Sequence, residues 1–126
     1  MRGLFDRFRN ADVHPGDRQL IGHMRQAGQR LATRERETTH YLHFTSDADA
    51  QRAATDARAR GFDVEVEAPG DGLVDWQVRA RHTILVEEGT ITAARRTLTR
   101  IAESAGGHYD GWDTFADEAL DRLSPG

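Results

Sequence analysis

The sequence contains no cysteine and no lysine. Without cysteine the chain has no disulfide, no thiolate nucleophile and no zinc–thiolate site. It also lacks any apolar run close to the roughly 20 residues that a membrane-spanning helix needs. Its charged start, residues 1–9, has no apolar stretch typical of a signal peptide. We therefore expect a soluble, cytoplasmic protein without a membrane span.

The charges are unevenly distributed along the chain. Of its 126 residues 37% are hydrophobic and 30% charged, which suits one domain with one core. Residues 1–36 hold eight arginines and four acids, whereas residues 37–126 hold nine arginines and seventeen acids, so that the net charge is −4. A basic start on an acidic body argues against general nucleic-acid binding and permits contact with a basic protein.

Hydrophobic periodicity divides the chain into helices and strands. A helix is expected from Asp17, its N-cap, to about Arg34, and a turn of helix within 117–126. Between them we expect, in order, a strand at 38–44, an alanine-rich helix at 46–60, strands at 62–67 and 74–81, a helix at 90–105 capped by Thr90, and a strand at 108–115.

This order, a helix followed by β-α-β-β-α-β, predicts an α+β fold of the ferredoxin-like type: a four-stranded antiparallel sheet with two helices on one face. The two middle strands would form a hairpin with acids beside arginines on the open face. The extra N-terminal helix has no place in this scheme, so we expect it at the edge or on the open face of the sheet, or against a partner. We divide the chain into a flexible N-terminal arm (1–15), a single domain (16–116) and a short C-terminal tail (117–126).

The sequence offers no catalytic motif. No serine lies in a nucleophile elbow, and no base, nucleophile and oxyanion hole can be assembled. The outward side of the strand at 74–81 lacks the aromatic residues of an RNA-recognition motif. We therefore expect a protein that is not an enzyme, with no catalytic residue, no cofactor and no direct sequence-specific binding of nucleic acid.

Histidines are the remaining candidates for metal ligands. His40 and His43 fall on opposite faces of the strand at 38–44, so they do not form a pair. His108 and Asp110 share a strand face, but a metal site there would need ligands from elsewhere, and solvated side chains are the favoured interpretation. No metal is expected.

The stretch 106–114 is rich in glycine and aromatic residues, although aromatic residues make up only 7% of the chain. Strand alternation places Tyr109 and Trp112 on opposite faces, one closing the core and one covering the sheet, with Gly111 as a bulge. In the alternative interpretation the outward ring and the flanking Asp110 and Asp113 anchor a protein interface. The residues alone favour the core over the interface.

The motif Tyr109–Trp112 (Tyr-Asp-Gly-Trp), followed by Asp113 and Thr114 and preceded by a helix that ends in two glycines, resembles the C-terminal signature of the family called regulator of ribonuclease E activity B. The order of elements agrees over about residues 17–116. The resemblance implies a ferredoxin-like domain without catalytic activity that binds ribonuclease E outside its catalytic centre and inhibits it. It also implies that the signature residues serve the fold or a protein interface; they are Tyr109, Asp110, Gly111, Trp112 and Asp113.

The leading hypothesis is therefore a cytoplasmic regulator of RNA decay whose partner is ribonuclease E or another basic protein. Two alternatives stay open. One is a ferredoxin-like module that senses a small ligand at the sheet or at its helix ends, and the other is an immunity-type protein that neutralises a basic toxin. The sequence leaves the oligomeric state open.

Overall fold

The computed structural model describes residues 7–9, 16–31 and 33–123. In chain order its elements are β1 (Arg7–Arg9), α2 (Asp17–Gln26), β2 (Arg36–Phe44), α3 (Asp47–Ala59), β3 (Asp63–Glu67), β4 (Trp76–Ile84), α4 (Glu88–Ser104), β5 (His108–Phe115) and α5 (Asp117–Leu123). The rest of the N-terminal arm expected over residues 1–15 lies outside the described residues. None of the described helices is long and apolar enough to cross a membrane.

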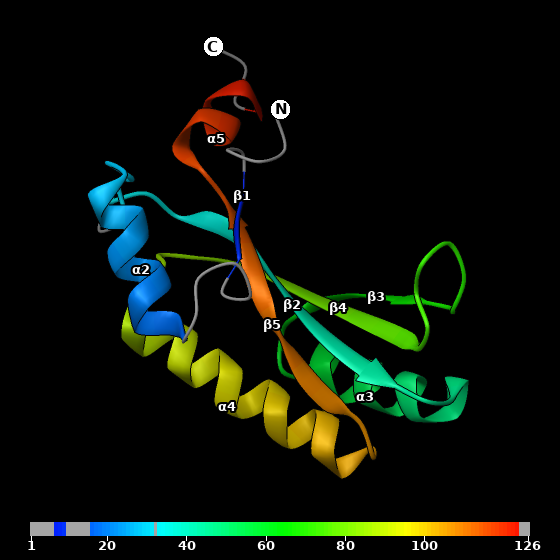
Figure 1. The fold of residues 1–126 in the computed structure, drawn as a ribbon. Coiled ribbons are helices and arrows are strands. Elements are labelled where there is room, and N and C mark those ends of the chain that lie inside the picture. Colours follow the sequence, from blue (N-terminus) through cyan, green and yellow to red (C-terminus); the bar gives the residue numbers. More distant parts are fainter. Residues whose placement is uncertain (1–6, 10–15, 32, 124–126) are drawn as a thin grey trace.

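The strands form one sheet in the order β1-β5-β2-β4-β3, with every neighbouring pair antiparallel. The inner order β5-β2-β4-β3 arises from two βαβ halves around the β3–β4 hairpin, so the predicted ferredoxin-like α+β fold is confirmed. Strand β1 was not among the elements predicted from the sequence. This short strand adds a fifth member to the sheet at the edge beside β5 (Figure 1).

Helices α2, α3 and α4 all lie on one face of the sheet, which we call the helical face (Figure 1). The predicted N-terminal helix, α2, packs beside α4 near the edge formed by β5 and β1. It therefore lies near an edge of the sheet, one of the places expected for it, but on the helical face and beside α4. No helix of the described chain covers the opposite face, which we call the open face.

Helix α2 is shorter than the apolar periodicity predicted, because it ends at Gln26 and not near Arg34. Gly28, with φ +83°, provides the left-handed conformation that closes the helix. Its N–H donates to the carbonyl of Arg25 at 3.0 Å, and the next N–H donates to that of Met24 at 3.0 Å. The N-cap is Gly16, so the prediction of Asp17 as the N-cap is wrong; the Asp17 side chain serves tertiary contacts.

The ends of the other two long helices follow local sequence signals. Ser46 caps α3 as predicted, since its side chain accepts the N–H of Asp49 at 3.2 Å. Helix α4 begins earlier than predicted: its N-cap is Glu87, and Thr90 is the third residue inside the helix. The Thr90 hydroxyl accepts the N–H of Glu87 at 3.1 Å. Thr90 therefore supports the cap without being the N-cap residue.

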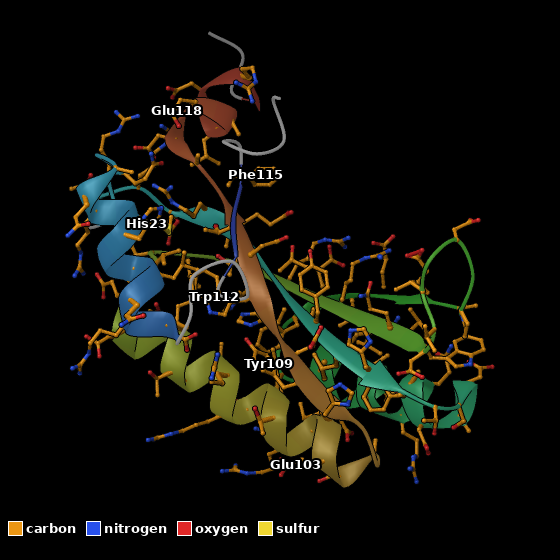
Figure 2. All side chains as sticks on the ribbon, viewed as in Figure 1. His23, Glu103, Tyr109, Trp112, Phe115 and Glu118 are labelled. Carbon is orange, nitrogen blue, oxygen red and sulfur yellow. The ribbon has the colours of Figure 1, made fainter. Side chains whose placement is uncertain are left out.

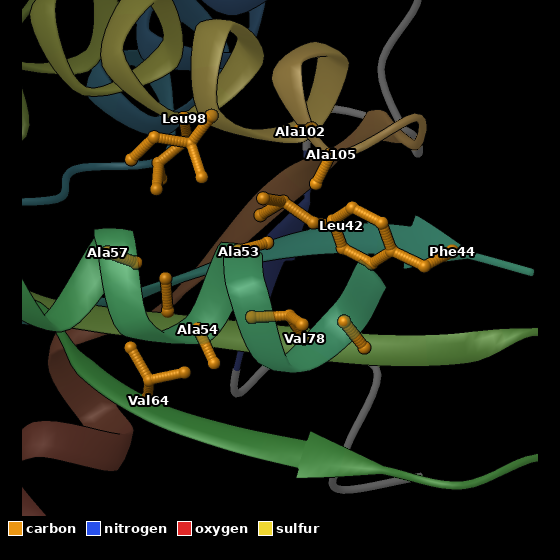
Figure 3. Close-up of a cluster of buried hydrophobic side chains, with 13 residues drawn as sticks. Leu42, Phe44, Ala53, Ala54, Ala57, Val64, Val78, Leu98, Ala102 and Ala105 are labelled. Atoms are coloured by element: carbon orange, nitrogen blue, oxygen red, sulfur yellow. The ribbon is translucent and has the colours of Figure 1, made fainter. Parts of the chain in front are cut away.

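Two clusters of buried side chains join the helical face to its helices. In the first (Figure 3), α3 contributes only alanines, each 0% exposed: Ala50, Ala53, Ala54 and Ala57. Because these side chains are short, α3 packs close to the sheet. The second cluster joins α2 and α4 to β5 and includes Leu20, Met24 and Trp112. Helix α2, which is additional to the ferredoxin-like fold, is thus packed through this second cluster.

The segment after β5 is α5, the turn of helix predicted in the tail. Buried charges hold its first residue against the sheet. The Arg36 side chain is 0% exposed, and its Nη2 donates to Oδ1 of Asp117 at 2.6 Å. The backbone N–H of Arg30 donates to the other carboxylate oxygen at 2.8 Å. Burial alone would raise the pKa of Asp117, but the hydrogen bonds from Arg30 and Arg36 hold it below its usual value.

Candidate functional site

The candidate signature lies on β5, where a β-bulge changes the direction of its side chains. Neighbouring residues of β2 pair with Gly111 and Tyr109, which leaves Asp110 as an extra residue. Gly111 has φ +121°, so the predicted bulge is confirmed. The extra residue puts Tyr109 and Trp112 on the same side of β5, facing α4 and α2 (Figure 2). The prediction that the two rings point to opposite faces is therefore wrong.

Trp112 connects the sheet to the N-terminal helix. Its ring is 0% exposed within the second cluster, and its Nε1 donates to Oδ1 of Asp17 at 2.8 Å. The same oxygen accepts a hydrogen bond from Nη2 of Arg95 on α4, also at 2.8 Å. A single carboxylate at the start of α2 therefore ties together β5, α4 and α2.

A chain of polar side chains, partly exposed except for the buried His40, continues from Arg95 into the sheet. The Arg95 guanidinium carbon lies 5.3 Å from the centre of the Tyr109 ring, a cation–π geometry. The Tyr109 hydroxyl is 2.8 Å from Nδ1 of His40, and Nε2 of His40 is 3.0 Å from Nε2 of His82. A neutral imidazole donates through one ring nitrogen and accepts through the other, so His40 satisfies both contacts without a charge.

Burial keeps this chain of groups uncharged apart from its arginine. Burial, with smaller contributions from the neighbouring His82 and Arg95, lowers the pKa of His40 to about 3. Burial also lowers the pKa of His82 and raises that of Tyr109. The pairing of His40 with His82 was not predicted, because the strand expected at 74–81 ended before His82. In the structure β4 continues to Ile84, and both histidines lie on the helical face of neighbouring strands.

The two acids of the signature have different surroundings. Asp110 lies at the bulge with its side chain 51% exposed, and its carboxylate is 3.2 Å from Nε2 of His43. Asp113 is buried on the open face and accepts the hydroxyl of Tyr41 at 2.7 Å. As predicted, His43 and His40 lie on opposite faces of β2. Within the described residues no three histidine or acidic side chains gather as metal ligands.

The open face carries most of the acids of the sheet. On β2, β3, β4 and β5 its charged residues are Glu37, Asp63, Glu65, Glu67, Asp110 and Asp113, together with Arg79 and Arg81. With histidines neutral, these six acids and two arginines give the open face of these four strands a charge of −4. Glu65 and Glu67 remain about half exposed, at 55% and 45% of their side chains.

The two arginines of the open face are paired with acids of the neighbouring strand, as the hairpin predicted. Glu65 of β3 lies opposite Arg79 of β4 in the register. Arg79 binds Glu67 at 2.5 Å and is 3.5 Å from Glu65, which also accepts a hydrogen bond from Arg81. That hydrogen bond and the two guanidinium charges lower the pKa of Glu65. The remaining acids give the face its negative charge.

The fold and its open face place the chain among α+β domains of the ferredoxin-like type. Within this class its family is known from sequence: the family model described as regulator of ribonuclease activity B matches residues 15–114. The chain belongs to this family, which is one of regulators and not of enzymes. No curated protein matches the sequence.

Proposed function

We propose that the protein is a non-catalytic regulator that binds ribonuclease E through the open face of its sheet and inhibits RNA decay. The observation that carries this proposal is a sheet face of net negative charge over β2–β5 that no described helix covers, in a member of a family of ribonuclease regulators. A negative surface attracts a basic partner and increases its rate of association. The same charge repels phosphates, which supports regulation through protein contacts without sequence-specific binding of RNA.

The open face offers both charge and a ring to a partner. Glu37 and Asp63 are exposed and make no direct ion pair with other described residues, since the charge of Arg81 acts on both only at longer range. Their carboxylates can therefore bind cations of a partner. The Tyr41 ring lies half-buried near the centre of the face. Tyrosine is frequent at the energetic centres of interfaces. We therefore place the partner's basic side chains over β2 and β3, around this ring.

The five signature residues divide between the two faces in this proposal. Tyr109 and Trp112 maintain the fold from the helical face, where their hydrogen bonds join α2, α4 and the sheet. Gly111 permits the bulge, and Asp110 extends the acidic surface. Asp113 orients the Tyr41 hydroxyl at 2.7 Å. The signature would then act on binding mainly through the shape of β5. We propose that the protein acts in the cytoplasm without metal or cofactor.

Cleavage of a labelled RNA by ribonuclease E of the same organism, with and without an excess of the full chain, tests this proposal. We expect cleavage to slow with increasing protein and the effect to weaken as salt is added, because surface charges are screened. Binding of the two proteins is measured in parallel by fluorescence anisotropy. Absence of binding at micromolar concentration in low salt would exclude ribonuclease E as the partner.

Charge-neutral variants test whether the open face is the surface that binds. Replacing Glu37→Gln together with Asp63→Asn removes two open-face carboxylates that have no ion-pair partner. We expect the affinity to fall by about three- to tenfold, since exposed charges contribute little each. The matched control is Glu103→Gln with Glu118→Gln, which removes two exposed acids from α4 and α5 (Figure 2). An equal loss in both variants would show that only net charge matters and that the open face is not the site.

A further inference from the structure

The helical layer is hollowed between α3 and α4, on the side of the sheet away from the open face. The larger part of this groove has a volume of about 390 Å³ and is lined by Arg60, Phe62 and His82, and by the first turns of α4. A smaller part of about 220 Å³ shares Arg60 with it and adds Arg100 and Asp56. The larger part alone is within the size range of small-molecule sites.

The groove carries two arginines that are not paired with acids of the described residues. Arg60 and Arg100 make no hydrogen bond or ion pair with other described residues, whereas Arg79, Arg81 and Arg95 are all bound to acids. Asp56 offsets one of the two charges in the smaller part. Since Arg60 borders both parts, a positive charge remains at their junction. A guanidinium group matches the geometry of a carboxylate or a phosphate.

The larger part of the groove has an aromatic wall with one free hydrogen-bonding atom. The rings of Phe62 and His82 are 4.9 Å apart between their centres and tilted by 41°. Nε2 of His82 is occupied by His40, but its Nδ1 has no partner among the described residues. Three apolar side chains and two threonines complete the lining: Ile84, Ala93, Ala94, Thr90 and Thr97. This part therefore suits a ring, whereas Arg60 suits an anion.

We propose that this groove binds a small molecule in which an aromatic ring carries a phosphate or a carboxylate group. The ring lies against Phe62 and His82, where Nδ1 of the imidazole can bond a polar ring atom if the ring has one, and the anionic group lies on Arg60. The site is on the helical face, so it does not depend on the proposed binding of ribonuclease E to the open face. The shared chemistry is an aromatic anion, and the probes below distinguish a phosphate from a carboxylate.

The test titrates the full chain with adenosine 5′-monophosphate, with phenylpyruvate and with inorganic phosphate, by calorimetry and amide NMR. We expect saturable binding of one molecule of at least one aromatic probe, with shifts at Phe62, His82 and Thr97. The probe that binds more tightly identifies the preferred anion. If neither aromatic probe binds more tightly than about 1 mM, or if phosphate alone binds as tightly as they do, the proposal is wrong.

Three variants locate the site. Arg60→Gln removes the anion contact, and we expect it to weaken binding about tenfold. Ala93→Trp fills the groove from an exposed helix position and should abolish binding without unfolding the protein. The control Arg96→Gln removes an exposed arginine of α4 that does not line the groove. If Arg60→Gln and Arg96→Gln have equal effects while thermal unfolding is unchanged, the groove is not the site.

Discussion

His40 makes the stability of this protein depend on pH in a way that can be measured. The residue is 0% exposed, and its pKa is lowered to about 3 from the 6.5 of a free histidine. As the pH falls below 6.5, the unfolded chain takes up a proton that the folded chain does not. The free energy of unfolding therefore decreases as the pH falls from about 6.5 toward 3.

The size of this effect follows from the two pKa values. Between pH 7 and pH 5 His40 alone lowers the free energy of unfolding by about 2 kcal/mol. For a chain of this length that corresponds to a fall of roughly 5–10 °C in Tm. His82, whose pKa is also lowered by burial, changes the stability in the same direction. Burial is thus the main cause of the expected acid sensitivity near pH 6.

The assay is urea unfolding at pH 7 and at pH 5 of the wild type, of His40→Gln and of His23→Gln. Glutamine keeps hydrogen-bonding atoms at position 40 but cannot titrate, so the stability lost between the two pH values should be about 2 kcal/mol smaller than in the wild type. His23→Gln, at an exposed position of α2, makes the same substitution away from the buried pair and serves as the comparison (Figure 2). An equal loss in His40→Gln and the wild type would refute the reasoning.

Three substitutions test the packing described above. Gly107→Ala should destabilise the protein by about 2–3 kcal/mol, because a Cβ would overlap a carbonyl and an aromatic ring of β2; the control Gly89→Ala, in helix α4, meets nothing within 4 Å and should leave Tm unchanged or raise it slightly. Asp117→Asn should cost about 3 kcal/mol in urea unfolding, since it leaves the buried charge of Arg36 without a full partner; no loss would mean that α5 is not held by this pair. Trp112→Phe should cost about 1–2 kcal/mol by removing the N–H that donates to α2, and an unchanged Tm would show that this hydrogen bond contributes nothing.

Periodicity predicted the elements of the sheet well because each strand and helix has one buried side. The strand expected at 108–115 is β5 with the same bounds. The end of α2 was predicted less well, since the apolar positions continue to Leu31, which is buried in a loop beyond the helix. Gly28 was a local signal for the earlier end. Residue propensity and periodicity together would have predicted the end of α2 correctly.

The bulge in β5 shows what the sequence alone does not determine. Gly111 indicated that a bulge was possible, but the faces of Tyr109 and Trp112 depend on which residue is inserted, and that is fixed by pairing with β2. The inserted residue is Asp110, three positions separate the two rings, and both therefore point to the helical face. The contact between His40 and His82 depends in the same way on strand order. Register and strand order are tertiary properties, and local periodicity does not contain them.

The two proposed sites meet in β4, whose neighbouring residues point to opposite faces. Arg81 belongs to the open face, whereas His82 belongs to the wall of the groove. A ligand in the groove and a partner on the open face therefore do not compete for the same space. Any effect of ligand binding on partner binding must be transmitted through the sheet. Its size is given by the ratio of the partner affinities measured with and without the ligand. Equal affinities would mean that the two faces of the sheet function independently.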